Sequence, residues 1–294
     1  MELEEYTQYH EIKSHAKPGF AYNTYICTIP LDFARVRPHW HEEMELIYIK
    51  KGAGRVSVDL EEYAVTAGCI ALVLPGRLHA IEGAPGAPME YENILFSPSL
   101  LDSPADDWFR AACAAPLRAG QLNVPTLLTP DTALGRRAAA CLDAADDACR
   151  TADAGYPLLV KSELYRLFYY LYTAPEASAP RHAAPAAARL KAVLTWLAAH
   201  YAEPVDVAAA ARAASYSPAH FMRFFKAGTG QTFVAYLTDY RLAAAARALA
   251  ETAAPVGEVA AHCGFESLSY FSRSFRRRYG TSPRAYRDAR STAG

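Results

Sequence analysis

Between about residues 20 and 97, apolar residues come in short stretches separated by glycines. The stretch VSVDLEEYAV (56–65) alternates in part between apolar and polar residues, and CIALVL (69–74) is an unbroken apolar run. Alternation with a period of two is typical of a strand with one buried face, and a short apolar run is typical of a fully buried strand. The pattern therefore predicts an all-β region folded as a sandwich or a small barrel.

After Pro98 the spacing of the apolar residues becomes helical. Over 156–173 they recur every three or four positions, which predicts an amphipathic helix. Its apolar face consists of Val160, Leu164, Leu167, Phe168 and Leu171. Such a face needs a covering surface. We expect helices within 134–172 to associate in a homodimer, with Leu164, Leu167, Phe168 and Leu171 as the apolar seam.

Proline and alanine dominate residues 174–188, which predicts a linker. Helical spacing then returns, with apolar faces at Leu190, Val193, Leu194 and Leu197 and at Phe233, Tyr236, Leu237 and Tyr240. A length of 294 residues suits two domains. We expect a β domain with a helical extension over 1–173 and an all-α domain over 189–290.

Composition indicates a cytoplasmic protein. Every apolar stretch of about 18 residues is interrupted by charge, so no transmembrane segment is expected. The first 15 residues are acidic and lack the apolar core of a signal peptide. Six cysteines without CxxC spacing indicate reduced thiols.

The two ends of the chain differ in charge. Residues 186–294 hold 14 basic and 7 acidic residues, a net charge of +7, whereas the rest holds 16 basic and 24 acidic residues, a net charge of −8. A basic C-terminal third on an acidic body favours contact with a polyanion at that end. A basic surface without a partner would show the same balance.

The C-terminal region contains an internal repeat at an offset of 50 residues. The stretch SPAHFMRFFKAGTG (217–230) lies over SLSYFSRSFRRRYG (267–280), and Ala209-Ala210 lies over Val259-Ala260. Each copy has a short apolar helix, a turn and a second helix that begins with a serine suited to capping. Phenylalanines four residues apart would dock the second helix on its domain and leave Arg223 and Arg273 on another face. Two copies favour a double helix-turn-helix over a repeat that serves packing alone.

Residues 188–290 resemble the AraC/XylS family of bacterial transcription regulators. The resemblance is carried by VGEVAAHCGFESLSYFSRSFRRRYGTSPRAYR (256–287) and by the connecting stretch TFVAYLTDYRLAAAARALAE. It implies two helix-turn-helix units joined by a helix over about 233–250, whose recognition helices enter successive major grooves. By position, the base-facing residues would be Ala219, Met222 and Arg223 in the first unit and Ser269, Tyr270 and Arg273 in the second. Further DNA contacts would come from Lys226, Arg276, Arg277 and Arg278.

The first unit departs from the second in two ways. It has Ala214 where the second has Gly264, the residue able to supply a positive φ in the turn, so its turn must be built differently. Ala219 and Met222 also offer only apolar contacts to bases, such as a thymine methyl group. We therefore expect the first unit to read less sequence than the second.

In the β region, HWHEEMELIYIKKG (39–52) contains His39, His41 and Glu45, and a third histidine, His79, follows a glycine and proline turn. The spacing resembles the two motifs of the cupin barrel, in which three histidines and a glutamate converge on one metal ion. Alternation along a strand would put His39 and His41 on one face. The asparagine that usually follows the last histidine of the motif is absent, since AIEG comes after His79.

Four interpretations of this cluster remain open. It could hold a catalytic metal ion, a metal ion without chemistry, or a small-molecule effector in a metal-free pocket, or its residues could simply pack in the barrel. The AraC resemblance implies a sensor domain, so a sugar or another metabolite is the expected effector. No cofactor is then required, and a divalent metal ion would be bound by His39, His41, Glu45 and His79.

Together these patterns predict a two-domain regulator rather than an enzyme. Its N-terminal domain would be an all-β, cupin-like barrel with a helical dimerisation extension, and its C-terminal domain an all-α double helix-turn-helix. Expected partners are promoter DNA, a small-molecule effector, a second copy and, for an activator, RNA polymerase, with no membrane partner. The alternative is a metal-dependent cupin enzyme with a helical accessory domain.

Overall fold

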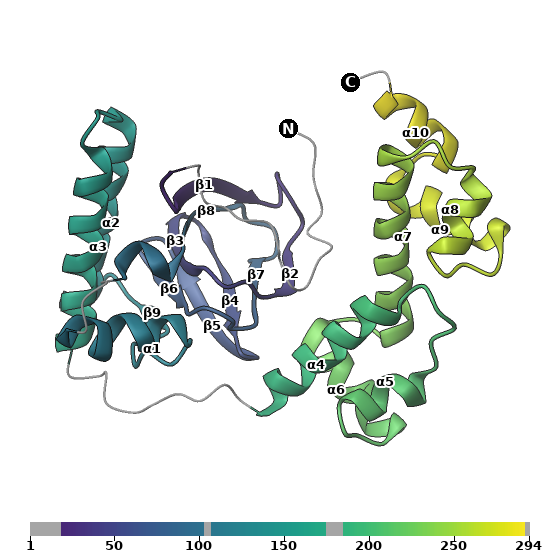
Figure 1. Cartoon of the computed structure of the whole chain (residues 1–294), viewed down its shortest axis with the longest axis horizontal. Helices are drawn as coiled ribbons and strands as arrows, with labels where there is room; N and C mark the ends of the chain where they lie inside the picture. Colours follow the sequence, from purple (N-terminus) through teal and green to yellow (C-terminus); the bar gives the residue numbers. More distant parts are fainter. Residues whose placement is uncertain (1–18, 103–106, 175–184, 292–294) are drawn as a thin grey trace. The chain divides into compact units, whose positions relative to one another are not determined.

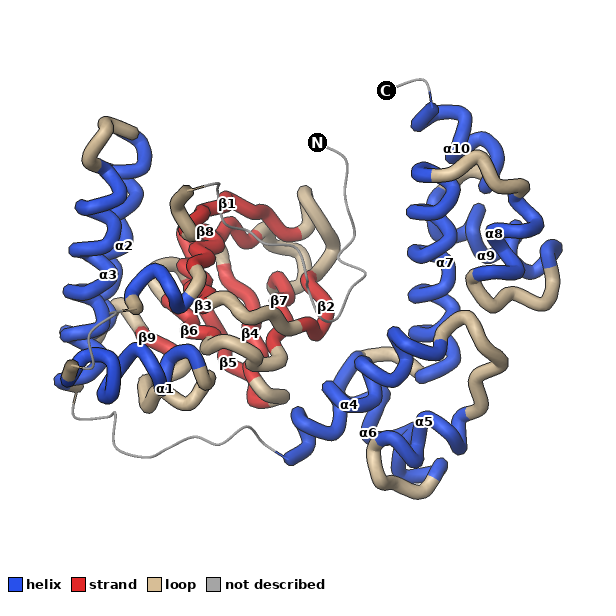
Figure 2. The backbone as a smooth tube through the Cα atoms, in the orientation of Figure 1, coloured by secondary structure: helices blue, strands red, loops and turns tan. Residues whose placement is uncertain are grey.

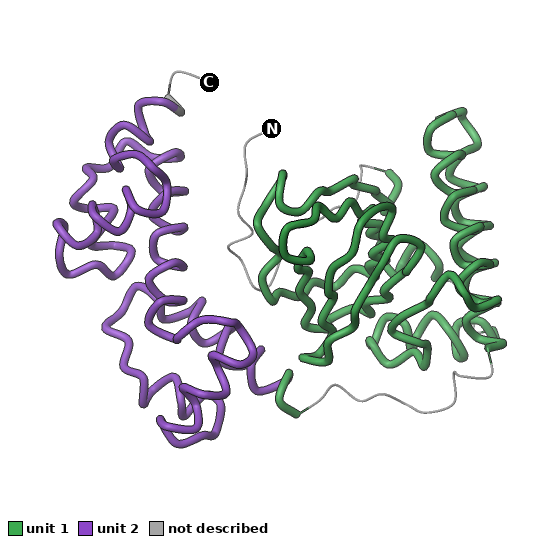
Figure 3. Tube along the Cα trace, turned by 180° about the vertical axis from the view of Figure 1, so that it is seen from behind, with its two compact units in different colours: residues 1–6, 10–187 green, residues 7–9, 188–294 purple. Residues whose placement is uncertain are grey.

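The computed structural model of the chain describes residues 19–102, 107–174 and 185–291. Contacts within the chain divide it into two compact units that meet in sequence at residues 187 and 188 (Figure 3). Most of the expected linker, 174–188, lies outside the described residues. Its last part is already helical, because helix α4 (Pro185–His200) begins there.

The first unit is built on two antiparallel sheets, as expected for 20–97 (Figure 1). One sheet has the strand order β1-β8-β3-β6-β9 and the other the order β2-β7-β4-β5. The prediction of an all-β barrel or sandwich in this region is confirmed. The strands are β1 (Tyr22–Ile29), β2 (Val36–His39), β3 (Met44–Lys51), β4 (Ala53–Val58), β5 (Glu61–Thr66), β6 (Ile70–Val73), β7 (His79–Gly83), β8 (Met89–Phe96) and β9 (Leu127–Leu128).

Strand β3 is buried on both faces, which explains its nearly continuous apolar sequence. Met44 and Leu46 contribute to a core shared with the helices outside the sheet. Ile47 and Ile49 point the other way, into a core shared with residues of the second sheet. Because side chains alternate along a strand, Glu45 shares its face with Ile47 and Ile49. A buried carboxylate is thereby placed on the inner side of the barrel.

Helices cover the outer face of the first sheet. Short helical turns, η1 (Pro98–Leu101), η2 (Arg110–Ala114) and α1 (Ala115–Arg118), lead to the two-residue strand β9 and then to a hairpin of α2 (Ala133–Thr151) and α3 (Tyr156–Thr173). The expected apolar face of α3 exists, and its residues are at most 3% exposed. They pack against α2 and the sheet within one copy of the chain. The prediction that Leu164, Leu167, Phe168 and Leu171 form a dimer seam is therefore wrong.

The described part of the second unit is helical (Figure 2). Phe221 and Phe225 are fully buried, as are their repeat counterparts Phe271 and Phe275, so each pair docks its helix as predicted. Ala and Leu residues of α7 complete the second of these cores. After α4 the helices are α5 (Val207–Ala213), α6 (Pro218–Thr229), α7 (Phe233–Glu251), α8 (Val256–His262), α9 (Leu268–Tyr279) and α10 (Pro283–Ser291).

Among the described residues, no helix combines the length and the apolar character that crossing a lipid bilayer requires.

Candidate DNA-binding face and buried histidine cluster

Helices α5 and α6 form one helix-turn-helix unit, and α8 and α9 form the other. The side-chain oxygen of Ser217 accepts a hydrogen bond from the backbone N–H of His220 (3.4 Å), and that of Ser267 accepts one from Tyr270 (3.2 Å). These are N-caps, which satisfy backbone donors that the first helical turn leaves free. Both recognition helices, α6 and α9, end at a glycine with φ of 72°. The repeat in the sequence is therefore a repeat in structure.

The two turns reach the same geometry with different lengths. In the second helix-turn-helix unit Gly264 has φ of 82°, and the N–H of Phe265 donates to the carbonyl of Ala260 (3.0 Å). In the first helix-turn-helix unit Ser215 has φ of 56°, and the N–H of Tyr216 donates to the carbonyl of Ala211 (3.0 Å). Equivalent residues of the two helix-turn-helix units are thus 49 positions apart up to the turn and 50 positions apart after it. Ala214 needs no positive φ because Ser215 takes that conformation.

The recognition helices expose the residues between their buried phenylalanines. Arg223 and Lys226 on α6 and Arg273, Arg276 and Arg277 on α9 all have exposed side chains. So do Ala219, Ser269 and Tyr270, whereas Met222 is half-buried. An exposed basic face on a capped helix can enter a DNA major groove with its charges toward phosphates and base edges.

In the barrel, three histidines and a glutamate meet at a junction of the two sheets. His39 closes β2 and lies directly opposite His79 on β7, with ring centroids 4.0 Å apart. Glu45 comes from β3 in the other sheet, and its Oε2 lies 2.8 Å from His41 Nε2 and 2.7 Å from His79 Nε2. All four side chains are at most 5% exposed, and one ligand atom from each lies within 4.8 Å of the others.

The route to this convergence differs from the expected alternation along one strand. Strand β2 ends at His39, and β3 starts at Met44, so the chain passes from one sheet to the other in between. His41 lies in that crossing segment rather than on the strand of His39. The residues meet because the crossing, not strand periodicity, brings them together.

Two backbone carbonyls orient the histidine rings. The Nδ1–H of His39 donates to the carbonyl of Arg37 (2.9 Å), and that of His79 donates to the carbonyl of Arg77 (3.0 Å). Because a carbonyl only accepts, Nδ1 must carry the hydrogen in both rings, which leaves Nε2 as the lone-pair nitrogen of the neutral form. Metal-binding histidines are held in the same way.

Burial and close contacts within the cluster shift the pKa values of two of its residues. Burial, followed by the charge of His79, holds the pKa of His39 well below its usual range. Burial alone would raise the pKa of Glu45, but the charge of His79 and hydrogen bonds from His41 and His79 outweigh it and hold that pKa well below its usual range. The Nε2 of His79 lies 2.7 Å from the Glu45 carboxylate. Three imidazole nitrogens and one carboxylate form a donor set that fits a divalent metal ion.

Two family models match the chain. One describes an AraC-like ligand binding domain and matches residues 24–168; the other describes a helix-turn-helix domain and matches residues 210–289. Together they cover both units described above.

The chain belongs to the AraC/XylS family of transcription regulators.

This AraC/XylS chain matches its relatives over only part of their length. The HTH-type transcriptional activator RhaS of Escherichia coli O157:H7 is 39% identical over 104 residues, 35% of this chain and 37% of RhaS. The Right origin-binding protein of Escherichia coli (strain K12) is 35% identical over 98 residues, 33% of this chain and 34% of the relative. Among solved structures, the DNA-binding domain of AdpA in complex with a target DNA is 38% identical, covering 34% of this chain and 91% of that domain, with a TM-score of 0.33. The chain thus spans little more than a third of the length of the curated relatives it matches.

In this AraC-family chain, Arg278 is not exposed, although the family resemblance implied a DNA contact for it. Its guanidinium forms an ion pair with Asp239 of α7 (3.1 Å), and its side chain is only 12% exposed. Arg278 thus ties α9 to the connecting helix, and the geometry does not support its assignment as a DNA contact. Arg276 and Arg277 remain exposed.

His220 is a candidate that the sequence interpretation missed. After the turn the offset is 50, so His220 occupies the place of Tyr270, and both side chains are exposed near the start of their recognition helix. The His220 ring also lies 4.1 Å from that of Tyr216. The alignment of the two repeats already contained this signal, because SPAH lies over SLSY.

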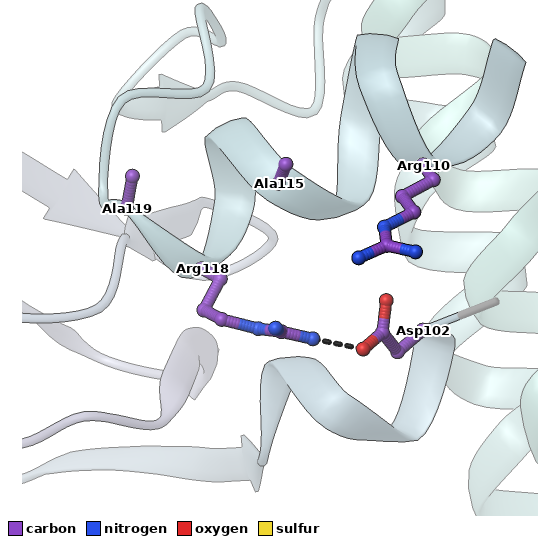
Figure 4. Close-up of a pocket in the computed structure, with 5 residues that line it drawn as sticks. All are labelled: Asp102, Arg110, Ala115, Arg118 and Ala119. Atoms are coloured by element: carbon purple, nitrogen blue, oxygen red, sulfur yellow. Dashed lines mark hydrogen bonds and ion pairs between the residues drawn. The ribbon is translucent and has the colours of Figure 1, made fainter. Parts of the chain in front are cut away.

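A surface pocket of about 250 Å³ lies beside α1 (Figure 4). An ion pair joins Arg118 and Asp102 across it, and Arg110 points toward the same carboxylate. Its lining contains none of the four residues of the histidine cluster, so the effector candidates named from the sequence are not part of it. The lining residues are Asp102, Arg110, Ala115, Arg118 and Ala119.

Proposed function

We propose that this protein is a sequence-specific, DNA-binding transcription regulator that responds to a ligand in its N-terminal unit. The observation that carries the proposal is the pair of capped recognition helices, α6 and α9, joined by the single helix α7 and exposing arginines at equivalent places. In this proposal residues 1–173 sense the ligand and residues 189–290 bind DNA. The names of the relatives, an activator and an origin-binding protein, support it.

Within this function, the exposed residues fall into two groups. Residues near the start of each recognition helix would face bases: Ala219, Met222 and Arg223 on α6, and Ser269, Tyr270 and Arg273 on α9. Basic residues further along, Lys226, Arg276 and Arg277, would hold phosphates. Base contacts carry sequence information, whereas phosphate contacts add affinity for any sequence. RNA polymerase is the further partner if the protein activates transcription in the cytoplasm.

The test is selection of binding sites by the full-length protein from a pool of random double-stranded DNA. We expect an enriched sequence with two protected segments about one helical turn, roughly 34 Å, apart. Its affinity should fall steeply as salt rises, because phosphate contacts release counterions. Recovery of DNA without any shared sequence would overturn the proposal.

We further propose that His39, His41, Glu45 and His79 hold a divalent transition-metal ion in the sensor unit. Support comes from burial, from the hydrogen bonds to Arg37 and Arg77 that orient the rings of His39 and His79, and from the carboxylate of Glu45 close to them. A bound ion would supply a positive charge at the junction of the sheets and a coordination point for an effector. Elemental analysis of natively purified protein tests this proposal, and near-stoichiometric metal is the expected result.

A second copy of the chain is the partner we propose for the outer face of α3. Four large apolar side chains on this face are exposed at intervals of three, four or seven residues. They are Leu158 (74% exposed), Tyr165 (39%), Tyr169 (63%) and Tyr172 (48%). This spacing forms a straight stripe on a helix, which suits antiparallel pairing across a two-fold axis. The stripe lies on a different face of α3 from the buried Leu164 and Leu171, and Tyr165 also packs on Phe109 within the same copy.

A further inference from the structure

The connecting helix α7 carries a charged clamp at its centre. The guanidinium of Arg241 donates to two carbonyls of the segment after α4: its Nε to Tyr201 (2.7 Å) and its Nη2 to Glu203 (2.7 Å). That segment leads directly into α5 of the first helix-turn-helix unit. Arg241 therefore fixes the first helix-turn-helix unit to the middle of α7 by a forked pair of charge-assisted hydrogen bonds.

The same guanidinium supports the turn of the second unit. A Cβ built on Gly264 would lie 2.8 Å from Arg241 Nε and 2.7 Å from the Tyr201 carbonyl oxygen. No side chain fits there, so the turn backbone rests directly on the guanidinium and on the first unit's carbonyl. Glu266, at the end of this turn, also interacts electrostatically with Arg241. One side chain thus holds elements of both units.

A second clamp lies two residues earlier on α7. Asp239 accepts a hydrogen bond from the amide of Gln231 (3.4 Å), which follows α6, and pairs with Arg278 of α9 (3.1 Å). Residues two apart on a helix point in different directions. Asp239 and Arg241 therefore bind the two units from different sides of α7.

Each helix-turn-helix unit has its main apolar contact on a different part of α7. The first unit packs on the start of α7, where Phe225 contacts Phe233 and Tyr236. The second unit packs on the later part, around Leu242 and Leu249. Between these two contacts lie the polar clamps, together with the packed rings of Tyr201 and Tyr240, whose centroids are 5.0 Å apart.

We propose that Arg241 and Asp239 are positioning residues that set the spacing of the two DNA segments the protein recognises. The proposal rests on the DNA-binding function proposed above. With the clamps in place, α6 and α9 keep a fixed separation and direction. Inserting one base pair turns the second segment by about a tenth of a helical turn and moves it by roughly 3.4 Å. A rigid pair of helices can follow that change only by distorting the DNA.

The experiment uses the DNA selected by the wild-type protein and the same DNA with one base pair inserted between its two protected segments. The measured quantity is the insertion penalty, the ratio of the two dissociation constants at fixed salt. We expect about tenfold or more for the wild type. For Arg241→Met and Asp239→Asn we expect weaker binding to the selected DNA and a penalty of about threefold or less. Arg247→Met, at an exposed position of the same helix, should keep the wild-type penalty.

Two outcomes would overturn the proposal. Variants that weaken binding to both DNAs equally, with an unchanged penalty, would show that the clamps do not set spacing. Loss of the circular-dichroism spectrum and of cooperative melting in both variants would show that the clamps hold the fold instead. If only Arg241→Met fails to fold, Asp239→Asn decides. Failure of the wild type to select any sequence would instead contradict the proposed function.

Discussion

The barrel and the helical unit place their candidate functional side chains differently. In the barrel, His39, His41, Glu45 and His79 are almost inaccessible to solvent and converge on one point. In the helical unit, basic side chains such as that of Arg273 are exposed along capped helices. A buried cluster excludes large ligands and suits a single small cation, whereas an exposed row suits a polymer of charges. Substitutions in the barrel cluster should therefore abolish binding of the metal ion, whereas substitutions on the exposed row should only reduce the affinity for DNA.

The largest effect is expected at the buried cluster. His41→Ala removes one of the four proposed donors, an imidazole whose Nε2 lies 2.8 Å from Glu45, so metal content should fall from near-stoichiometric to a trace. Elemental analysis of natively purified protein measures this, with His262→Ala on exposed α8 as the control. A wild type that lacks metal but still answers an effector would restrict the cluster to hydrogen bonding.

On the exposed face, Arg273→Ala should relax specificity at one position of the selected DNA. A bidentate arginine–guanine contact is worth about 1–3 kcal/mol of discrimination. Arg277→Ala should instead weaken binding to all sequences by a similar factor and flatten the salt dependence by about one counterion. Binding series on single-base variants at fixed salt distinguish the two. A uniform shift for Arg273→Ala would remove its base-reading role.

Helix α3 has both an exposed and a buried apolar face, and substitutions on the two faces should have different effects. Tyr169→Asp changes an exposed side chain and should leave thermal stability nearly unchanged while weakening the dimer by about tenfold or more. Leu164→Asp buries a charge in the core and should instead lower the melting temperature sharply. Sedimentation velocity and thermal melting measure the two effects. A wild type that is monomeric at tens of micromolar would contradict the dimer.

A smaller effect should appear where α2 meets the barrel. Burial, and then a hydrogen bond with Glu92, raises the pKa of Asp146 to about 8, although Lys50 lies 3.7 Å away. The unfolded chain loses this proton near pH 4 and the folded one near pH 8, so Asp146 lowers stability increasingly across that window. Asp146→Asn should therefore gain melting temperature over the wild type as pH rises from 4 to 8. The same substitution at the exposed neighbour, Asp147→Asn, is the matched control.

The smallest effect is expected for Arg223→Ala. Its neighbours on α6, Ala219 and Met222, offer no hydrogen bonds to base edges, so the first unit should contribute less sequence information than the second. We expect a loss of about threefold, spread over few positions, in the same binding series used for Arg273. A loss equal to that of Arg273→Ala would show that the two units read DNA equally.

Sequence patterns were sufficient where they report on one element and its immediate neighbours. The apolar pattern located the β region, and the repeat located the helices α6 and α9. The apolar face of α3 was also correct, but periodicity cannot say what covers it. Leu164 packs against its own sheet, a fact set by tertiary structure rather than by spacing.

The details that escaped prediction depend on single residues in the folded chain. The first turn is one residue shorter than the second, which an alignment at a constant offset of 50 hides until Ser215 is seen with a positive φ. Arg278 looked like its exposed neighbours, yet Asp239 on another helix draws it inward. The four residues of the cluster do converge, as the motif spacing implied, but the sequence did not show that they meet through a crossing between the sheets.

The order of the cluster residues along the chain has a consequence for folding. His39, His41 and Glu45 lie within seven residues, so even an unfolded chain holds them near one another, whereas His79 follows 34 residues after Glu45. A metal ion could therefore bind the unfolded chain through three donors, which would subtract from the stability it confers on the native state. Only the fourth donor requires the long loop to close, with its entropic cost, by pairing β7 with β2. The difference between the metal affinity of three donors in the unfolded chain and that of four donors in the folded chain thus reports the free energy by which metal binding favours closure of the barrel.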